Sequence, residues 1–491
     1  MDDTATSKLP ESTIEAHTTI EEPEAGDAAV VGECIAAGET AMTEITDYDQ
    51  SDADDLARAA AWGVYQEDHA ESLVETTLEA TGLGNATDKR PKVREWVKII
   101  LEDALDEPSV GRIPCSDPGV VEIAKPVGVV GGLVPSTNPV STVANLAILA
   151  LKGRNALVFS ASPAGLPPTA EAVGYIRAEL AAVGAPRNLV QVLPAPASKP
   201  KSNALLDQAD LVQVTGSAAN VRAGQASGTP NYCVGEGNPV ALVDTGADIE
   251  RVAADTVDSA AYDGGTVCAA ESCAVAPEAV YADLRTELAA AGGYRCDAAA
   301  TDRLRETLFP DGSGPDRAVI GRSAPDLAAE AGIDVPDGTT TLLVEPTDTD
   351  TDPLVTECLS PVLATLSVPD FAAGLDATER ILDRAGAGHS VAVHTDDRER
   401  ALRAARRLGV CRMVVNQPDL NSSGLADNGL APSLSMGGGT WAGNQLAHNL
   451  SCREFIQTTR VAFPVESDAT DDATVFAPYT EGANADTATD G

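Results

Sequence analysis

The fold is decided by residues 127–163, VGVVGGLVPSTNPVSTVANLAILALKGRNALVFSASP. Residues 127–135 form an unbroken run of apolar and small residues, which is typical of a strand buried on both faces. Residues 141–153 have the apolar pattern of a helix that ends at Gly153, and residues 155–163 form a second strand-like run. A strand, a helix and a second strand in this order predict a parallel sheet.

The same alternation continues along the chain. It predicts a helix over 168–183, a strand over 189–193, a helix over 202–208 and a strand over 211–215. Alternating strands and helices are the pattern of a doubly wound nucleotide-binding domain. A second alternating region covers residues 248–415, so the predicted fold class is α/β.

The composition agrees with helices packed on sheets. A chain of 491 residues exceeds what one hydrophobic core usually contains, so two or more domains are expected. Hydrophobic residues make up 43% of the chain but aromatic residues only 3%, which favours cores of small aliphatic side chains. Residues 51–80 and 90–105 are predicted to be amphipathic helices, since apolar positions such as Leu56, Ala60 and Val64 recur at helical spacing.

The chain is strongly acidic. Its formal charge of -42 comes from 75 acidic and 33 basic residues, so nucleic acid is excluded as an expected partner. Such self-repulsion is largely screened near 1 M salt, where the Debye length is about 3 Å, and we expect a salt-accumulating cytoplasm. Residues 1–44 and 466–491 are acidic and short of large apolar residues, and both are predicted to be disordered extensions.

The cysteines and the N-terminal residues exclude other classes. The 9 cysteines are scattered and odd in number, which argues against a disulfide scaffold. No CxxC pair occurs and there are only 5 histidines, so no metal site is expected. The first residues do not resemble a signal peptide, and no apolar run is long enough for a membrane span. We therefore expect a cytoplasmic protein without membrane association.

The segment LVQVTGSAANVRAG is the first candidate for cofactor binding. It places Thr215, Gly216 and Ser217 where a strand is followed by a helix. A helix N-terminus offers free N–H groups and the positive end of the helix dipole to a pyrophosphate. The segment does not match GxGxxG, so an ordinary turn is the alternative interpretation.

The segment YDGGTVCAAESC is the candidate for nucleophilic chemistry. Gly264, Gly265 and Thr266 precede Cys268, and such a short loop can expose a thiol to a substrate. Any single cysteine is more often a small buried hydrophobic residue. The other motifs of the chain therefore have to decide between these interpretations.

Six segments occur in the order and approximate spacing of the aldehyde dehydrogenase superfamily. They are the stretch 127–163, TGSAANVRAGQASGTPNYCVGEGNP, YDGGTVCAAES, ECLSPVL, AGAGHSVAVHTDD and GGGTWAGNQLAHNLSCREFIQTTRVAFP. The chain most resembles the CoA-acylating branch, which includes acetaldehyde and sulfoacetaldehyde dehydrogenases. The resemblance covers residues 45–465, approximately.

The resemblance implies a role for each matching residue. Cys268 matches the family nucleophile, and Asn138 matches the asparagine that forms the oxyanion hole with the backbone N–H of that cysteine. Glu357 matches the glutamate that binds the nicotinamide ribose, and residues 215–217 match the dinucleotide phosphate region. His389 lies where the acylating branch has a Gly-His pair; it either contacts cofactor or CoA or is a structural histidine. The other implied cofactor-binding positions are Pro135 and Ser160.

The resemblance also bears on the acyl acceptor. Hydrolytic members carry a glutamate in an ELGGK-like segment that activates water, and CVGEGN places Val234 at that position. Valine cannot act as a base, so CoA is the expected acceptor. Glu236 restores base chemistry if the register differs, which leaves a hydrolytic enzyme as the rival. Residues 163–166 lack the basic side chains that acylating relatives often carry there, so NAD and NADP both remain open.

We therefore expect an NAD- or NADP-dependent, CoA-acylating aldehyde dehydrogenase. Residues 45–245 are expected to bind the dinucleotide, residues 246–425 to present the nucleophile, and residues 426–465 to return to the first domain and end in an oligomerisation strand. A homodimer or homotetramer is implied. The aldehyde cannot be identified from the sequence. A non-catalytic binding or structural protein is a rival of another class, against which the intact Cys268 and Asn138 argue.

Overall fold

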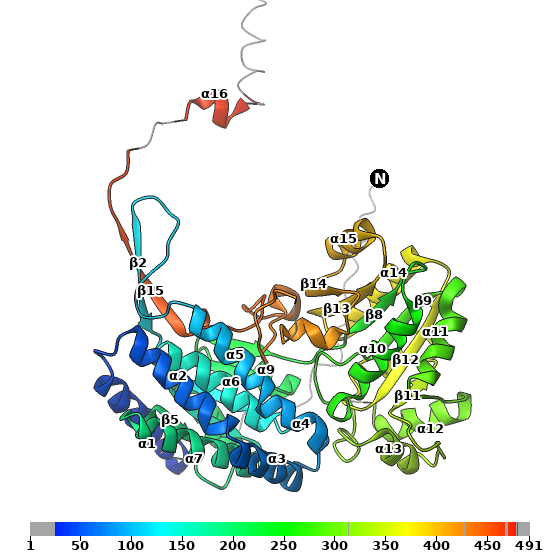
Figure 1. The fold of residues 1–491 in the computed structure, drawn as a ribbon, viewed down its shortest axis with the longest axis horizontal. Helices are drawn as coiled ribbons and strands as arrows, with labels where there is room; N and C mark the ends of the chain where they lie inside the picture. The colour runs from blue at the N-terminus through cyan, green and yellow to red at the C-terminus, as the bar shows by residue number, and fades with distance from the viewer. Residues whose placement is uncertain (1–24, 313, 426–427, 467–469, 478, 480–491) are drawn as a thin grey trace, which may run out of the picture.

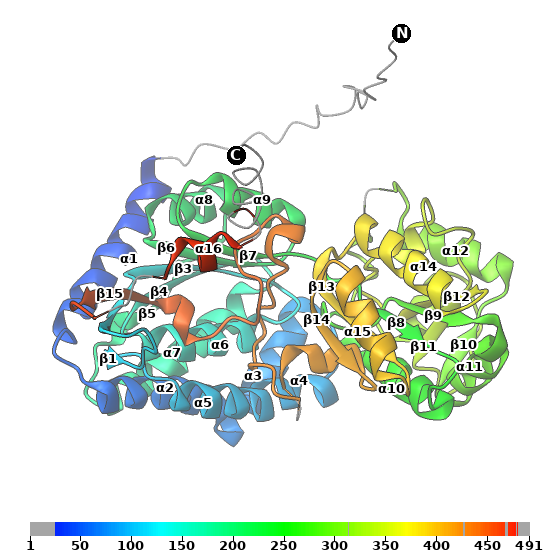
Figure 2. The same ribbon diagram turned by 90° about the horizontal axis from the view of Figure 1, so that it is seen from above.

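The computed structural model describes residues 25–312, 314–425, 428–466, 470–477 and 479. These residues form two lobes that lie side by side, each built on a parallel sheet flanked by helices (Figure 1, Figure 2). We call them the first lobe and the second lobe in chain order. A smaller antiparallel sheet projects from the first lobe as an arm (Figure 1). The predicted α/β class is confirmed.

The first lobe contains a five-stranded sheet of order β5-β4-β3-β6-β7. Its strands are β3 (Val129–Val134), β4 (Ala156–Ala161), β5 (Val190–Val192), β6 (Leu211–Thr215) and β7 (Asn231–Val234). All pairings are parallel. Every residue of β3, of β4 and of the helix between them is buried, because both faces of the strands and all sides of the helix are covered by other elements. The strand-helix-strand prediction for residues 127–163 is confirmed.

The helices of the first lobe cover both the sheet and one another. They are α1 (Ala25–Glu44), α2 (Gln50–Tyr65), α3 (Glu67–Thr81), α4 (Ala86–Val93), α5 (Glu95–Asp106), α6 (Pro139–Lys152), α7 (Leu166–Ala182), α8 (Lys199–Gln208) and α9 (Ala218–Ala226). The predicted helix over 51–80 is interrupted at Gln66, which has φ -52° and ψ 140°. The predicted helix over 90–105 is interrupted at Arg94, which follows the helix that contains Pro91.

Part of the predicted N-terminal extension is ordered. Residues 25–44 form helix α1, so the expectation of disorder is wrong there; residues 1–24 lie outside the described residues. Val31 and Ile35 are buried, and a Cβ added to Gly38 would lie 3.2 Å from the Cβ of Ala156 in β4. Small side chains therefore let this helix approach the sheet closely, and few large apolar residues are needed to bury it.

The second lobe contains a seven-stranded sheet of order β10-β11-β12-β9-β8-β13-β14, parallel throughout. Its strands are β8 (Val240–Val243), β9 (Cys273–Pro277), β10 (Gly293–Arg295), β11 (Thr341–Val344), β12 (Val362–Val368), β13 (Gly388–His394) and β14 (Val410–Val415). Its helices are α10 (Ile249–Ala261), α11 (Glu278–Ala290), α12 (Ala298–Leu308), α13 (Ala324–Glu330), α14 (Phe371–Arg384) and α15 (Arg398–Arg407). Because β8 belongs to this sheet, the chain enters the second lobe earlier than the predicted boundary at residue 245.

The arm is a three-stranded antiparallel sheet of order β1-β2-β15. Its strands are β1 (Gly111–Ile113), β2 (Val120–Pro126) and β15 (Ile456–Ala462). Before β15 the chain packs on the first lobe, since Leu446, Leu450 and Phe455 belong to that lobe's core. Of the predicted C-terminal tail, Asp472–Val475 form a short helix, α16, while residues 467–469, 478 and 480–491 lie outside the described residues.

From the sequence, neither a membrane span nor a metal site is expected. Within those residues no helix combines the length and apolar character needed to cross a bilayer. The same residues contain no cluster of three or more His, Cys, Asp or Glu side chains suited to holding a metal ion.

Candidate active site

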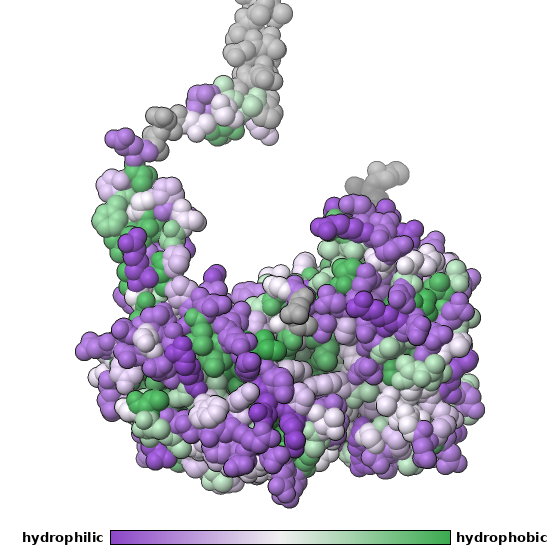
Figure 3. Space-filling view, viewed as in Figure 1, coloured by the Kyte–Doolittle hydropathy of each residue, from purple (hydrophilic) through white to green (hydrophobic). Residues whose placement is uncertain are grey.

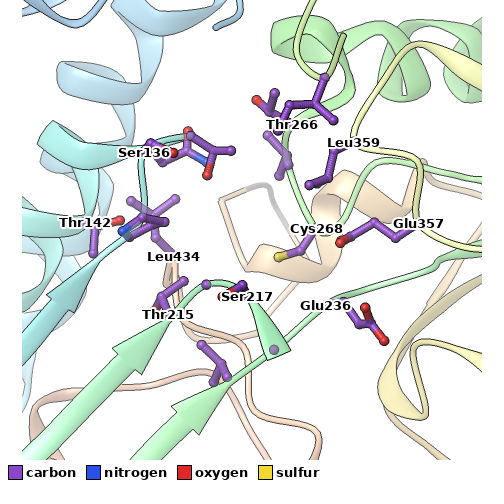
Figure 4. Close-up of a pocket in the computed structure, with 18 of the residues that line it drawn as sticks. Ser136, Thr142, Thr215, Ser217, Glu236, Thr266, Cys268, Glu357, Leu359 and Leu434 are labelled. Carbon is purple, nitrogen blue, oxygen red and sulfur yellow. The ribbon is translucent and has the colours of Figure 1, made fainter. Parts of the chain in front are cut away.

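A cavity of about 690 Å³ lies between the two lobes and contains most of the predicted site residues (Figure 4). Residues of the first lobe, the second lobe and the returning C-terminal segment all line it. The predicted residues among them are Pro135, Asn138, Thr215, Gly216, Ser217, Val234, Glu236, Cys268 and Glu357. The fold therefore brings together segments that are far apart in the sequence.

Ser160 and His389 lie outside this cavity. The hydroxyl of Ser160 is 2.9 Å from that of Ser202 on α8, and this contact accounts for its polar atom. His389 is buried at the start of β13 and lines a neighbouring cavity, together with Glu236 and the exposed Trp441. The two cavities adjoin each other, since Ala218, Gly235, Glu236 and Met436 line both.

Cys268 is presented by a loop that glycine makes possible. The 3-10 turn η2 (Tyr262–Gly265) follows α10, and Asp263, Gly264 and Gly265 have φ of 51°, 70° and 71°. A Cβ on Gly264 would lie 2.6 Å from the carbonyl oxygen of Gly321, so both the φ angle and the space require glycine. The DGG sequence thus turns the chain sharply and places Cys268 at the cavity wall.

A second glycine, Gly237, lies in close contact with the backbone of the same loop. A Cβ on Gly237 would lie 1.8 Å from the carbonyl oxygen of Cys268, closer than any real contact. The backbone N–H of Gly237 also donates a hydrogen bond to Glu357 Oε1 at 3.0 Å. Gly237 is therefore the point at which the nucleophile loop and the Glu357 segment meet.

The electrostatics of the cavity keep Cys268 protonated at neutral pH. Burial raises the pKa of its thiol to about 12; Glu357 adds to this rise, while Arg412 opposes it. Burial also raises the pKa of the Glu357 carboxyl to about 8. Figure 4 shows that carboxyl directed toward Cys268. Attack by Cys268 therefore requires loss of the thiol proton, and a Glu357 carboxyl with a pKa of about 8 is itself mostly protonated at neutral pH.

Asn138 lies at the junction between β3 and α6, where it is the N-cap residue. Its Oδ1 accepts a hydrogen bond of 2.6 Å from Lys92 Nζ. Lys92 in turn donates to Asp263 Oδ2 at 2.5 Å. The sequence interpretation missed Lys92 and Asp263. Lys89 and Lys92 are three residues apart and would lie on one face if the predicted helix began earlier than residue 90, but Asp88 and Glu95 are nearby in the sequence, so no local signal pairs Lys92 with Asp263.

The turn over residues 215–217 is built as a binding loop at the end of β6. Gly216 has φ 146°, a conformation that L side chains rarely adopt. Ser217 caps helix α9 by accepting a 3.4 Å hydrogen bond from the N–H of Asn220. Thr215 is anchored through Gln213, whose side chain donates to it at 2.8 Å. The arrangement offers hydroxyl and backbone donors to an anion in the cavity.

The two candidates for the water-activating position differ in placement. Val234 is buried at the end of β7 and lines the same cavity as Cys268. Glu236 is exposed, and Figure 4 shows its carboxylate directed away from Cys268. Among the predicted carboxylates only Glu357 is directed at the thiol.

A chain of buried polar contacts runs from His389 through Ser390 and Asp419 to Glu271, and of these residues only His389 was singled out from the sequence. His389 Nδ1 is 2.7 Å from Ser390 Oγ, which donates to Asp419 Oδ2 at 2.5 Å. The N–H of Asp419 donates to Glu271 Oε1 at 2.6 Å. Burial raises the pKa of both carboxyls, and burial together with Arg412 lowers the pKa of His389 to about 3. His389 is therefore a neutral imidazole at physiological pH.

Comparison with known proteins agrees with this geometry. The profile of the aldehyde dehydrogenase family matches residues 4–293. The chain is 38% identical to the acylating sulfoacetaldehyde dehydrogenase of Cupriavidus necator over 463 residues, which cover 93% of this chain and 94% of that protein.

The chain belongs to the aldehyde dehydrogenase family. It is also 32% identical to the acetylating succinate-semialdehyde dehydrogenase of Clostridium kluyveri, with 88% of this chain and 95% of that protein covered. The crystal structure of an acetylating aldehyde dehydrogenase from Geobacillus thermoglucosidasius superposes with a TM-score of 0.86 at 28% identity, covering 91% of this chain and 99% of that one. The aldehyde dehydrogenase fold expected from the sequence is therefore confirmed.

Proposed function

We propose that this aldehyde dehydrogenase converts an aldehyde, CoA and NAD(P)⁺ into an acyl-CoA and NAD(P)H in a reversible reaction. The observation that carries the proposal is that one cavity is lined by Cys268, Asn138 and the turn over 215–217, with Val234 in its wall. Relatives named as acylating or acetylating enzymes match this chain over nearly its full length.

The first step joins the aldehyde to Cys268. The thiol proton passes to solvent, the sulfur bonds to the carbonyl carbon, and the carbonyl oxygen becomes an alkoxide. The side-chain amide of Asn138 and the backbone N–H of Cys268 stabilise this alkoxide, and one such preorganised donor typically lowers the barrier by about 3–4 kcal/mol. The product is a thiohemiacetal on Cys268.

The cavity fits a dinucleotide next to this intermediate. The hydroxyls of Thr215 and Ser217 and the N-terminal N–H groups of α9 form a donor set suited to a pyrophosphate, and Glu357 can accept a hydrogen bond from a ribose hydroxyl. A bound NAD or NADP supplies the acceptor for the hydride that leaves the thiohemiacetal carbon. Loss of that hydride leaves an acyl thioester on Cys268.

The final step passes the acyl group to the thiol of CoA. Val234 cannot prime a water molecule, and the Glu236 carboxylate is directed away from Cys268 (Figure 4). The thioester therefore persists until a stronger nucleophile arrives. Attack by the CoA sulfur forms the acyl-CoA, breaks the Cys268 thioester and returns a proton to the Cys268 sulfur.

Hydrolysis is the second candidate, because Glu357 points at Cys268 and a carboxyl with a pKa of about 8 can act as a base. Product analysis separates the two reactions. With purified protein, an aldehyde and NAD(P)⁺, formation of an acyl-CoA only when CoA is added supports the acylating reaction. Steady formation of a carboxylate without CoA supports hydrolysis.

We propose an aldehyde with an anionic group as the substrate. Arg317 is the only basic side chain among the described residues that line the cavity, and it is exposed. Two of the relatives are named for sulfoacetaldehyde and succinate semialdehyde, which both carry an anionic group. Arg317→Met should then raise KM for such an aldehyde more than KM for acetaldehyde; an equal effect on both would contradict the proposal.

We also propose that the enzyme works in a salt-rich cytoplasm as a dimer or tetramer. The charge of -42 and the hydrophilic residues over much of the face in Figure 3 support the first part. Apolar residues on the arm support the second, since Val461, Phe463 and Val465 are each at least 40% exposed. Light scattering of the wild type and of Phe463→Asp in molar KCl tests the assembly.

A further inference from the structure

Two lysines and one aspartate form a buried cluster beside the nucleophile loop. Lys89 and Lys92 of α4 are 5% and 2% exposed, and Asp263 of the turn η2 is fully buried. Both ammonium groups pair with the same oxygen of Asp263, at 2.9 Å and 2.5 Å. Burying three charges is costly, so a cluster that only held two segments together could be replaced by apolar side chains at little loss.

Only one of the two lysines touches Asn138. Lys92 Nζ donates to Asn138 Oδ1 at 2.6 Å, whereas Lys89 Nζ contacts the main-chain oxygen of Thr137 at 3.3 Å. A protonated lysine has three donors and no acceptor, so it can pair with the oxygen of an amide but never with its NH₂ group. Lys92 therefore distinguishes the two ends of the Asn138 side chain.

We infer that Lys92 is a positioning residue, which holds the Asn138 amide with its NH₂ group directed to the cavity where the substrate oxygen lies. Without this contact the amide can rotate and present its oxygen, which would repel an alkoxide instead of stabilising it. A charged donor also polarises the amide and strengthens its N–H groups as donors. The inference rests on the proposed function only in requiring that Cys268 be acylated through a tetrahedral oxyanion.

Asp263 connects the Lys92–Asn138 contact to the loop that carries Cys268. Its backbone has φ 51°, in the left-handed region, and its side chain also accepts a 3.0 Å hydrogen bond from the N–H of Asn85. The hydroxyl of Thr266 donates to the carbonyl oxygen of Asp263 at 2.9 Å. One carboxylate thus links the loop that carries Cys268 with the lysine that orients Asn138, so that both reacting groups share one support.

The protonation of Lys92 predicts that the orientation of the Asn138 amide depends on pH. Lys92 faces the charges of Asp263, Lys89 and Asp88, and its Nζ lies 5.3 Å and 5.7 Å from the ring centroids of Tyr262 and Trp96. Burial lowers its pKa to about 8, against the pull of Asp263. Above that pH a neutral amine can accept from the amide NH₂, and the orientation of Asn138 is no longer determined.

The test uses p-nitrophenyl acetate, which acylates a thiol without dinucleotide or CoA. The Cys268 sulfur bonds to the acetyl carbon, the ester C–O bond breaks, p-nitrophenolate leaves and the thiol proton goes to solvent. The burst of p-nitrophenolate is compared for wild type, Lys92→Met, Lys89→Met, Asn138→Ala and the double variant Lys92→Met/Asn138→Ala. Lys89→Met is the matched control, because it removes a partner of the same carboxylate but no contact of the Asn138 side chain.

Lys92→Met should lower the burst rate by roughly 10- to 100-fold, the loss expected for one charged hydrogen bond. Lys89→Met should have a much smaller effect at similar thermal stability. The double variant should be no slower than Asn138→Ala alone, since Lys92 acts through Asn138. As pH rises through about 8, the burst rate of the wild type should also fall relative to the burst rate of Lys92→Met, which has no amine to deprotonate.

Additive losses in the double variant, or equal losses for both lysines, would overturn the inference, because a structural role predicts those results. Absence of any burst in the wild type would also overturn it, since no oxyanion would then form at Cys268. Failure of the proposed function is distinguished by a separate assay of acyl-CoA formation: a normal burst with no acyl-CoA refutes the function and leaves the positioning role intact.

Discussion

Substitution of Gly237 by alanine should slow catalysis by roughly 100-fold in a protein that still folds. The added Cβ would lie 1.8 Å from the carbonyl oxygen of Cys268 and 2.8 Å from its carbonyl carbon, and both are backbone atoms. To restore a normal contact the loop must move by more than about 1 Å, and a misplacement of that size costs roughly 100-fold in rate. Overpacking of this kind costs about 1–3 kcal/mol of folding stability.

Gly235→Ala is the matched control for this prediction. A Cβ at Gly235 would lie 3.8 Å from a methyl carbon of Val221, an ordinary contact, and the residue is only two positions away. Steady-state NAD(P)H formation with saturating aldehyde and CoA gives kcat, and a thermal melt gives stability. The reasoning is refuted if Gly237→Ala retains kcat close to that of Gly235→Ala while remaining folded.

Three further predictions follow from the cavity and the charge. Val234→Glu should add CoA-independent formation of carboxylate, since a positioned general base typically contributes 10²- to 10⁴-fold, roughly; product analysis without CoA checks this, with Val234→Gln as the control. The pKa of Glu357 rises from 4.5 to about 8 on folding, so this group stabilises the protein at pH below about 4.5 and the contribution is lost as pH rises to about 8. Glu357→Gln should therefore lose less stability than the wild type between pH 5 and 8, approximately, in thermal melts; parallel curves would contradict the assignment. Stability should rise on going from low salt to about 1 M KCl, because the Debye length falls to about 3 Å; a melting temperature independent of KCl would contradict the account of the -42 charge.

Local sequence patterns were enough to predict the strands, helices and loops around the site. The strand over 211–215 was predicted with the bounds that it has, and Gly153 follows α6 as expected. Both predictions rest on properties of consecutive residues, namely apolar runs and the preference of glycine for helix ends. The same holds for Gly264 and Gly265, which predict a short loop before Cys268; the structure has a turn there.

Contacts between distant segments could not be predicted in this way. Lys92 and Asp263 are 171 positions apart, and no local pattern pairs them. Helix α1 was missed for a related reason, because its small residues look like those of a solvated segment until a sheet is placed against one of its faces. His389 was expected to be either a ligand contact or a structural histidine. The contacts show its Nδ1 paired with Ser390, while it still lines the neighbouring cavity.

The most direct test of the account is the identity of the acyl product. Purified protein in molar KCl is given NAD(P)⁺ and a panel of aldehydes that includes sulfoacetaldehyde and succinate semialdehyde, with and without CoA, and the products are identified by mass spectrometry. We predict an acyl-CoA that forms only when CoA is present and that is abolished by Cys268→Ala. Sustained formation of a free carboxylate without CoA would contradict the proposed role of Val234 and of CoA.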